Sequence, residues 1–149
     1  MAFISVKNKM FNHTDLFIVY EIIHTNFLDY YNRIGLFFVG LIPVPVRPPN
    51  FHNVITTLPT VKMIVEVSKS VAILTTVSLI KLLRSKEAQT VVEARQWPIM
   101  IPTEDLPKKR MTPSYRPPGA DKTAYLDFSV STTGMLAGVK VGPRTSYQH

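Results

Sequence analysis

The sequence predicts a mainly α-helical protein with two helices, at about residues 14–41 and 60–96. Three observations lead to this prediction. Apolar residues recur every three or four positions in the first segment, the second segment contains neither proline nor glycine, and prolines cluster between and after the two segments. Because proline fixes φ and lacks a backbone N–H, such clusters separate regular elements.

The first predicted helix has one apolar face. Leu16, Ile23, Phe27 and Ile34 follow helical spacing, and either Asn12 or Thr14 is suited to cap the N-terminus. The same segment is dense in β-branched and aromatic residues, which favour strands. A strand is therefore the competing interpretation here.

A proline-rich hinge is predicted at residues 43–59. Its prolines begin with Pro43 and Pro45 and continue with Pro48 and Pro49. Such a segment favours the extended polyproline II conformation. We interpret it as a stiff connector in preference to a ligand for an aromatic groove.

The second predicted helix contains an uncharged run from Val71 to Ile80. With its flanks, the segment 63–83 has about the length that a membrane span requires. Glu66 inside such a span is costly, so a helix buried in a protein partner or lying in a membrane interface fits as well. The sequence leaves these three alternatives open.

The C-terminal part, residues 98–149, is predicted to be an irregular, proline-rich and basic tail that is disordered or wraps a partner. The domain organisation expected is thus a helical region at 1–97 followed by this tail. Within the tail, alternation of Leu126, Phe128 and Val130 with polar residues predicts a short β-hairpin over 124–141. Gly134 would allow the turn.

Charge suggests an anionic partner. The formal net charge is +7, and the surplus lies in the middle and the tail. Phospholipid, RNA or an acidic protein face would each suit such a surface. The predicted contact residues are all basic: Lys81, Arg84, Lys86, Lys108, Lys109 and Arg110. The competing interpretation is a solvated surface, with the first three cations complementing the C-terminal dipole of a helix.

Motifs of catalysis are not apparent. The glycines form no phosphate loop, there is no cysteine, and the four histidines have no metal-ligand spacing. We therefore expect no enzyme, no cofactor, no metal site and no small-molecule substrate.

Gly119, Asp121 and Tyr125, followed by Thr132-Thr133-Gly134 and Gly138, resemble the small single-span subunits of respiratory complexes, of the cytochrome c oxidase subunit seven-a type. The similarity covers about 25 of 149 residues. It departs from the family because Asp127 and Lys140 bracket too few uncharged residues to span a bilayer. It implies a non-catalytic subunit of a mitochondrial membrane complex.

The function expected is accordingly an accessory, structural subunit of a membrane-associated complex at the mitochondrial inner membrane. The chain begins with no secretory signal and is not expected to be secreted. Its partners would be a larger protein assembly or an anionic membrane surface. The alternative is a basic RNA- or ribosome-associated accessory protein. A further alternative is a poorly folded or mispredicted open reading frame, because composition shifts along the chain.

Overall fold

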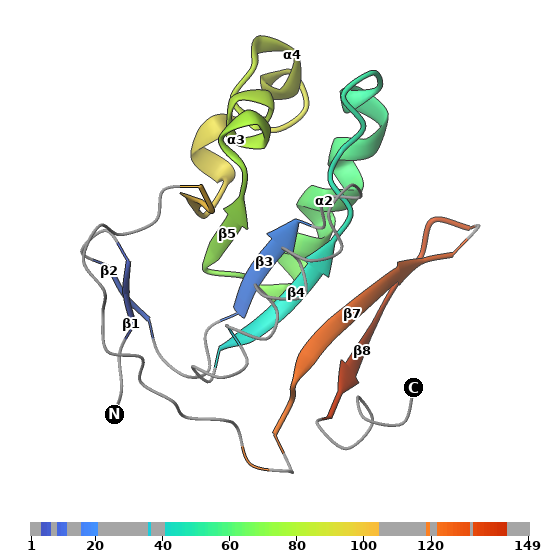
Figure 1. Ribbon diagram of the computed structural model, residues 1–149. Helices are drawn as coiled ribbons and strands as arrows, with labels where there is room; N and C mark the ends of the chain where they lie inside the picture. Colours follow the sequence, from blue (N-terminus) through green and yellow to red (C-terminus); the bar gives the residue numbers. More distant parts are fainter. Residues whose placement is uncertain are drawn as a thin grey trace.

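The computed structural model describes residues 4–6, 9–11, 16–20, 36, 41–104, 119, 122–131 and 133–142. Its centre is a parallel sheet in the order β4-β3-β5-β6 (Figure 1). The strands are β3 (Leu16–Tyr20), β4 (Ile42–Val46), β5 (Ala72–Thr75) and β6 (Ile99–Pro102). The prediction of a mainly α-helical protein is therefore wrong, because strands and helices alternate along the chain.

Helices connect the parallel strands, as the geometry of a parallel crossover requires. α2 (Val54–Ser68) lies between β4 and β5. α3 (Val77–Leu83), α4 (Lys86–Gln89) and a short 3-10 helix (Ala94–Gln96) lie between β5 and β6. Two antiparallel hairpins complete the described part: β1 (Ile4–Val6) with β2 (Lys9–Phe11), and β7 (Tyr125–Val130) with β8 (Leu136–Val141).

The predicted helix at 14–41 begins as a strand. β3 pairs in parallel with β4 on one side and with β5 on the other, so the competing interpretation was right for residues 16–20. The β-branched and aromatic side chains of this segment suit the centre of a sheet. Residues 21–35 and 37–40 lie outside the described part.

The prediction of a proline-rich hinge at residues 43–59 is also wrong. Pro43 and Pro45 lie within β4, which forms one edge of the sheet. Proline is tolerated in an edge strand because its missing N–H can face away from the ladder. Pro59 lies inside α2, whose helical turns begin five residues earlier, at Val54.

The predicted helix at 60–96 is divided into several elements. α2 stops at Lys69, which adopts the left-handed conformation with φ 54°. The N–H of Ser70 then bonds the carbonyl of Val65 at 3.3 Å, which closes the helix end. The apolar run that follows is β5, bonded to β3 and β6. The segment 63–83 thus contains a helix end, a strand and a second helix.

Two apolar clusters bury the two faces of the sheet. The larger joins β4, β5, α2, α3 and α4, with Leu58, Ile73 and Leu83 fully buried. The smaller contains Leu36, Ala72 and Ile101. Burial on both faces is what makes strands of a parallel sheet read as continuous apolar runs.

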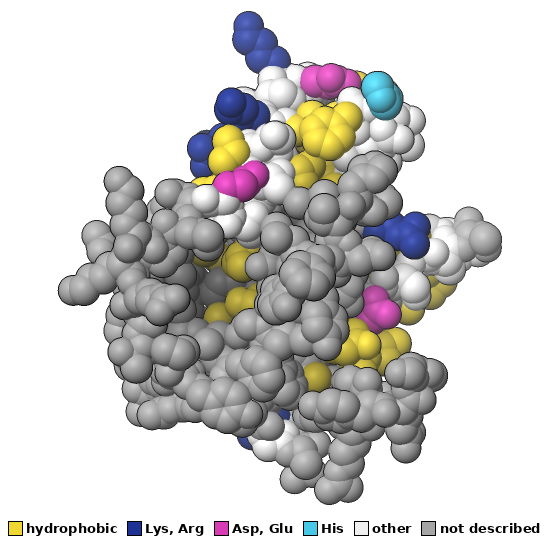
Figure 2. Space-filling model, in the orientation of Figure 1, with side chains coloured by type: hydrophobic (Ala, Val, Ile, Leu, Met, Phe, Trp, Pro, Cys, Tyr) yellow, Lys and Arg dark blue, Asp and Glu magenta, His cyan; other side chains and the backbone are white. Residues whose placement is uncertain are grey.

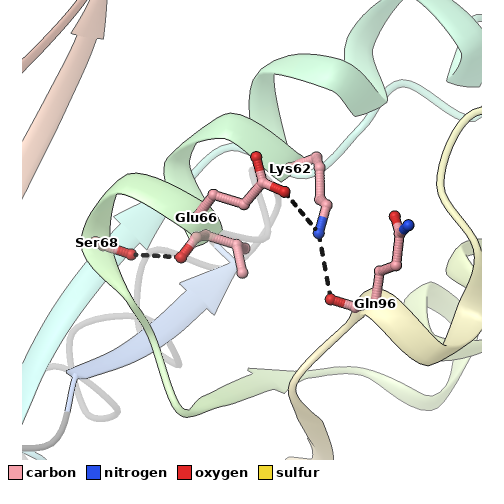
Figure 3. A network of polar contacts seen from close by, with 5 residues as sticks. Lys62, Glu66, Ser68 and Gln96 are labelled. Atoms are coloured by element: carbon pink, nitrogen blue, oxygen red, sulfur yellow. Dashed lines mark hydrogen bonds and ion pairs between the residues drawn. The ribbon is translucent and has the colours of Figure 1, made fainter.

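A polar contact fastens α2 to the 3-10 helix (Figure 3). The Lys62 ammonium lies 3.0 Å from the Glu66 carboxylate and donates to the carbonyl oxygen of Gln96 at 3.3 Å. It also lies 5.9 Å from the centre of the Trp97 ring. Because the Lys62 side chain is only 17% exposed, these contacts hold it between the two elements.

The predicted C-terminal hairpin is confirmed. β7 and β8 pair antiparallel from Tyr125↔Val141 to Val130↔Leu136. Leu126, Phe128 and Leu136 pack against the larger cluster, and β7 lies beside β4 (Figure 1). The division of the chain at residue 97 stays a prediction; β6 and this hairpin lie on its C-terminal side.

Within the described ranges, no helix is both long enough and apolar enough to cross a membrane.

Candidate functional site

The loop between β7 and β8 is built around one serine. Ser131 bonds across the loop in both directions: its N–H donates to Met135 at 2.9 Å, and its carbonyl accepts from Gly134 at 2.9 Å. Gly134 has φ 80°, a conformation that glycine adopts without strain. The loop is therefore tight and held by its own backbone.

The hydroxyls of Ser131 and Thr133 are hydrogen-bonded to each other in this loop. The N–H of Met135 donates to the Ser131 hydroxyl at 3.1 Å, and the Ser131 and Thr133 hydroxyl oxygens lie 2.7 Å apart. Only one of the two protons can lie between the oxygens, so the other is free for an outside acceptor. Both residues are exposed. Exposed hydroxyls and turned backbone amides are groups that bind phosphate oxygens.

The loop carries no cation of its own. The basic residue that follows it, Lys140, faces Leu126 five residues beyond Met135. At about 3.3 Å per residue, its Cα lies roughly 16 Å along β8. Lys140 and the loop tip therefore cannot contact the same phosphate group.

Beside the hairpin is a groove of about 920 Å³, between β7 and the β4–α2 connection. Its buried lining is apolar and includes Val46, Val61 and Ile64. Its exposed lining is mostly polar and includes Arg47 and Asp127, together with the apolar Val130. A volume of this size is typical of small-molecule sites.

The basic residues predicted as anion contacts lie elsewhere. Lys81, Arg84 and Lys86 are exposed on α3, its C-terminal cap and α4. Lys and Arg side chains gather over these helices at the top of Figure 2. Lys108, Lys109 and Arg110 lie outside the described residues. An anion-binding role for all six stays a prediction.

Gly134 was expected to allow the turn, but no chemistry was predicted for the hydroxyls beside it. The feature of the sequence that could have identified this loop as a site is the clustering of Ser131, Thr133 and Gly134 between two strands. A search for glycine-rich motifs overlooks it. In the described part of the chain, no three His, Asp or Glu side chains come together as metal ligands.

The chain is similar to a segment of much longer proteins. It is 59% identical over 107 residues to human Disco-interacting protein 2 homolog A, covering 72% of this chain and 7% of that protein. It is 56% identical over 107 residues to human homolog B, with the same coverage. The Drosophila melanogaster Disco-interacting protein 2 is 45% identical over 111 residues, 74% of this chain and 6% of that protein. The chain thus spans only about 7% of the length of these curated relatives.

Two solved structures with a similar fold contain bound adenylates. A Legionella pneumophila fatty acyl-adenylate ligase, solved with acyl adenylate and pyrophosphate, matches with a TM-score of 0.64 at 22% identity, over 87% of this chain and 21% of its own. The McyG A-PCP protein, solved with phenylalanyl-adenylate, matches with a TM-score of 0.64 at 20% identity, over 85% and 20%. No protein-family model matches the sequence.

These comparisons overturn several predictions. The resemblance to respiratory-chain subunits is wrong, because the relatives are Disco-interacting protein 2 homologues. The accessory-subunit and RNA-associated functions are wrong for the same reason. The expectations of no enzyme and no small-molecule substrate are wrong as well, because the structural neighbours are ligases. The mitochondrial location stays untested.

Proposed function

We propose that this chain forms the phosphate-contacting part of an acyl-adenylate-forming, ligase-type protein. The β7–β8 loop would contact the pyrophosphate group of the nucleotide. The observation that carries the proposal is the contact between the Ser131 and Thr133 hydroxyls, which uses only one of their two protons and leaves the other to donate to a ligand. The likeness of fold to ligases solved with acyl adenylates supports it.

The chemistry of the loop suits a polyanion held by hydrogen bonds. A hydroxyl that already accepts from a backbone amide is a better donor, because hydrogen bonds in a chain polarise one another. Phosphate oxygens accept such bonds strongly because they are charged. The loop would therefore position a pyrophosphate without neutralising it, and groups outside this chain would supply the positive charge.

Binding by the chain alone should be weak. With no cation at the loop tip, we expect a Kd for pyrophosphate on the order of 1 mM, equivalent to about −4 kcal/mol. The test is a titration of the full chain with pyrophosphate, followed by two-dimensional amide NMR. The signals of Ser131, Thr133, Gly134 and Met135 should shift together and saturate.

A matched pair of variants makes the test specific. Thr133→Val keeps the shape of the side chain and removes the hydroxyl, so the affinity should fall severalfold. Ser78→Ala removes an exposed hydroxyl on α3 and should leave the affinity unchanged. If saturating pyrophosphate leaves the loop signals in place, or if Thr133→Val binds as tightly as the unaltered chain, the proposal is wrong.

A further inference from the structure

The helix α2 carries apolar side chains on its exposed face as well as on its buried one. The buried face, which includes Leu58 and Val65, packs in the larger apolar cluster. On the exposed face, Ile55, Met63 and Val67 are 54%, 39% and 61% exposed. A helix that packs on one side only is expected to be polar on the other. The sheet layer therefore accounts for one apolar face of α2 and leaves the second open to solvent.

The exposed apolar residues of this helix form one ridge. Ile55, Pro59, Met63 and Val67 recur at every fourth position, and Phe51 lies four residues before Ile55, in the turn that precedes the helix. At 1.5 Å per residue, the helical part of the ridge is about 18 Å long. Four of the eight large apolar side chains that are exposed in the described part of the chain belong to it. Such a concentration marks an interaction surface, whereas single exposed apolar residues do not.

The ridge is nearly neutral, in contrast to the chain as a whole. The two charged residues of α2, Lys62 and Glu66, pair with each other at 3.0 Å, and Lys69 at the helix cap lies beyond the end of the ridge. The chain has a formal net charge of +7, and exposed cations lie on α3, its cap and α4. Lipid surfaces and nucleic acids bind basic patches, so neither suits this face. A partner that fits must offer a neutral, apolar surface of its own.

A second copy of the chain supplies such a surface. Helices pack when a row of side chains spaced four residues apart fits into the groove beside the same row of the other helix, at a crossing angle of about −50°. Pro59 is at the centre of the ridge, with two apolar residues on either side, so a twofold axis at this point relates the ridge to itself. We propose that two copies of this chain associate through the exposed face of α2, with the two helices crossing near Pro59. Association through α2 does not depend on phosphate binding by the β7–β8 loop.

The size of the ridge indicates a weak dimer. A standard interface takes about 800 Å² from each partner, contributed by roughly 20–30 residues. The ridge residues supply the apolar centre of such a surface but only a part of its area, so we expect a Kd on the order of 100 µM. The test is sedimentation equilibrium of the full chain from about 10 µM to about 1 mM. The average mass should rise with concentration from that of one chain towards that of two.

A matched pair of lysine substitutions locates the surface. Met63→Lys places a charge in the apolar contact, where the loss of its water is costly, so the dimer should weaken at least about tenfold. Val139→Lys is the control, because it adds the same charge at an exposed apolar residue of β8 and should leave the association unchanged. Both residues are exposed, so neither change should alter the fold, which circular dichroism checks.

Cysteine substitution tests the crossing point, because the chain contains no cysteine of its own. Pro59→Cys should form a disulfide between two copies under mild oxidation, since a disulfide requires Cβ atoms about 4 Å apart. Val139→Cys should cross-link much more slowly, and so should Pro59→Cys combined with Met63→Lys.

Three outcomes would contradict association through α2. A chain that stays monomeric at the highest concentration would mean that something other than a second copy covers the ridge. Met63→Lys could dimerise as strongly as the unaltered chain, or Pro59→Cys and Val139→Cys could cross-link at the same rate. A pyrophosphate titration of the Met63→Lys chain reports on Ser131 and Thr133, so failure of the proposed function is observed separately.

Discussion

The sheet layer, residues 41–104, and the C-terminal hairpin, residues 122–142, bury their apolar side chains to very different extents. In the sheet layer, Leu58, Ile73 and Leu83 are fully buried. In the hairpin, Met135 is 72% exposed and Val139 is 58% exposed. The sheet layer is therefore held by packing, whereas the hairpin is held by its own backbone ladder and by one face.

This difference fits a structure in which the sheet layer provides rigidity and the hairpin provides an exposed loop. A two-stranded hairpin is marginal in water unless one face rests on other elements. Here Leu126, Phe128 and Leu136 provide that face, and the loop at the far end stays exposed. A rigid layer thus carries an accessible loop, an arrangement common in binding sites.

The largest expected effect tests the packing of the sheet layer. Leu58→Ala removes a fully buried side chain from the packed face of α2, and the free energy of unfolding should fall by about 2–5 kcal/mol. Ile55→Ala on the same helix, at a residue that is 54% exposed, should change it by no more than about 0.5 kcal/mol. Urea unfolding followed by circular dichroism measures both. Equal effects would mean that α2 does not pack on the sheet as described.

A smaller effect is expected where the hairpin meets the core. A Cβ added at Gly138 would lie 2.7 Å from the Phe128 ring, so Gly138→Ala should displace the ring and cost about 1–3 kcal/mol. Hydrogen exchange should locate this loss in the amides of β7 and β8 while protection in β5 is kept. Gly142→Ala, where no heavy atom lies within 4 Å of the new Cβ, is the control. Loss of protection throughout the sheet would mean that the two regions unfold as one unit.

The smallest effect is expected at the end of α2. Lys69 has φ 54°, which strains a residue with a Cβ. Lys69→Gly should therefore stabilise the chain by about 0.5–1 kcal/mol. Lys81→Gly, at a helical position in the last turn of α3, should instead destabilise it by up to about 1 kcal/mol. Thermal unfolding of the two variants side by side measures the sign, and destabilisation by Lys69→Gly would contradict the described helix end.

Two physical ambiguities in the amino-acid pattern explain why the helices were predicted with the wrong bounds. A short apolar run such as Ala72–Thr75 fits a buried strand or a buried helix, because periodicity cannot separate them over four residues. The end of α2 also could not be predicted from the sequence, because a lysine and not a glycine adopts the left-handed conformation there. Pro59 was expected to precede a helix, but it lies inside α2. One lost hydrogen bond on an exposed face is not enough to prevent helix formation.

What the sequence determined by itself was local. The alternation around Phe128 and the turn at Gly134 identified the hairpin, since strand pairing across a short loop depends on neighbouring residues alone. Tertiary structure decided the rest. β5 is a strand because β3 and β6, 50 or more and 20 or more residues away in sequence, complete its hydrogen bonds. The groove likewise exists only because β7 lies beside β4, which brings residues of β7 and of the β4–α2 connection to one cavity.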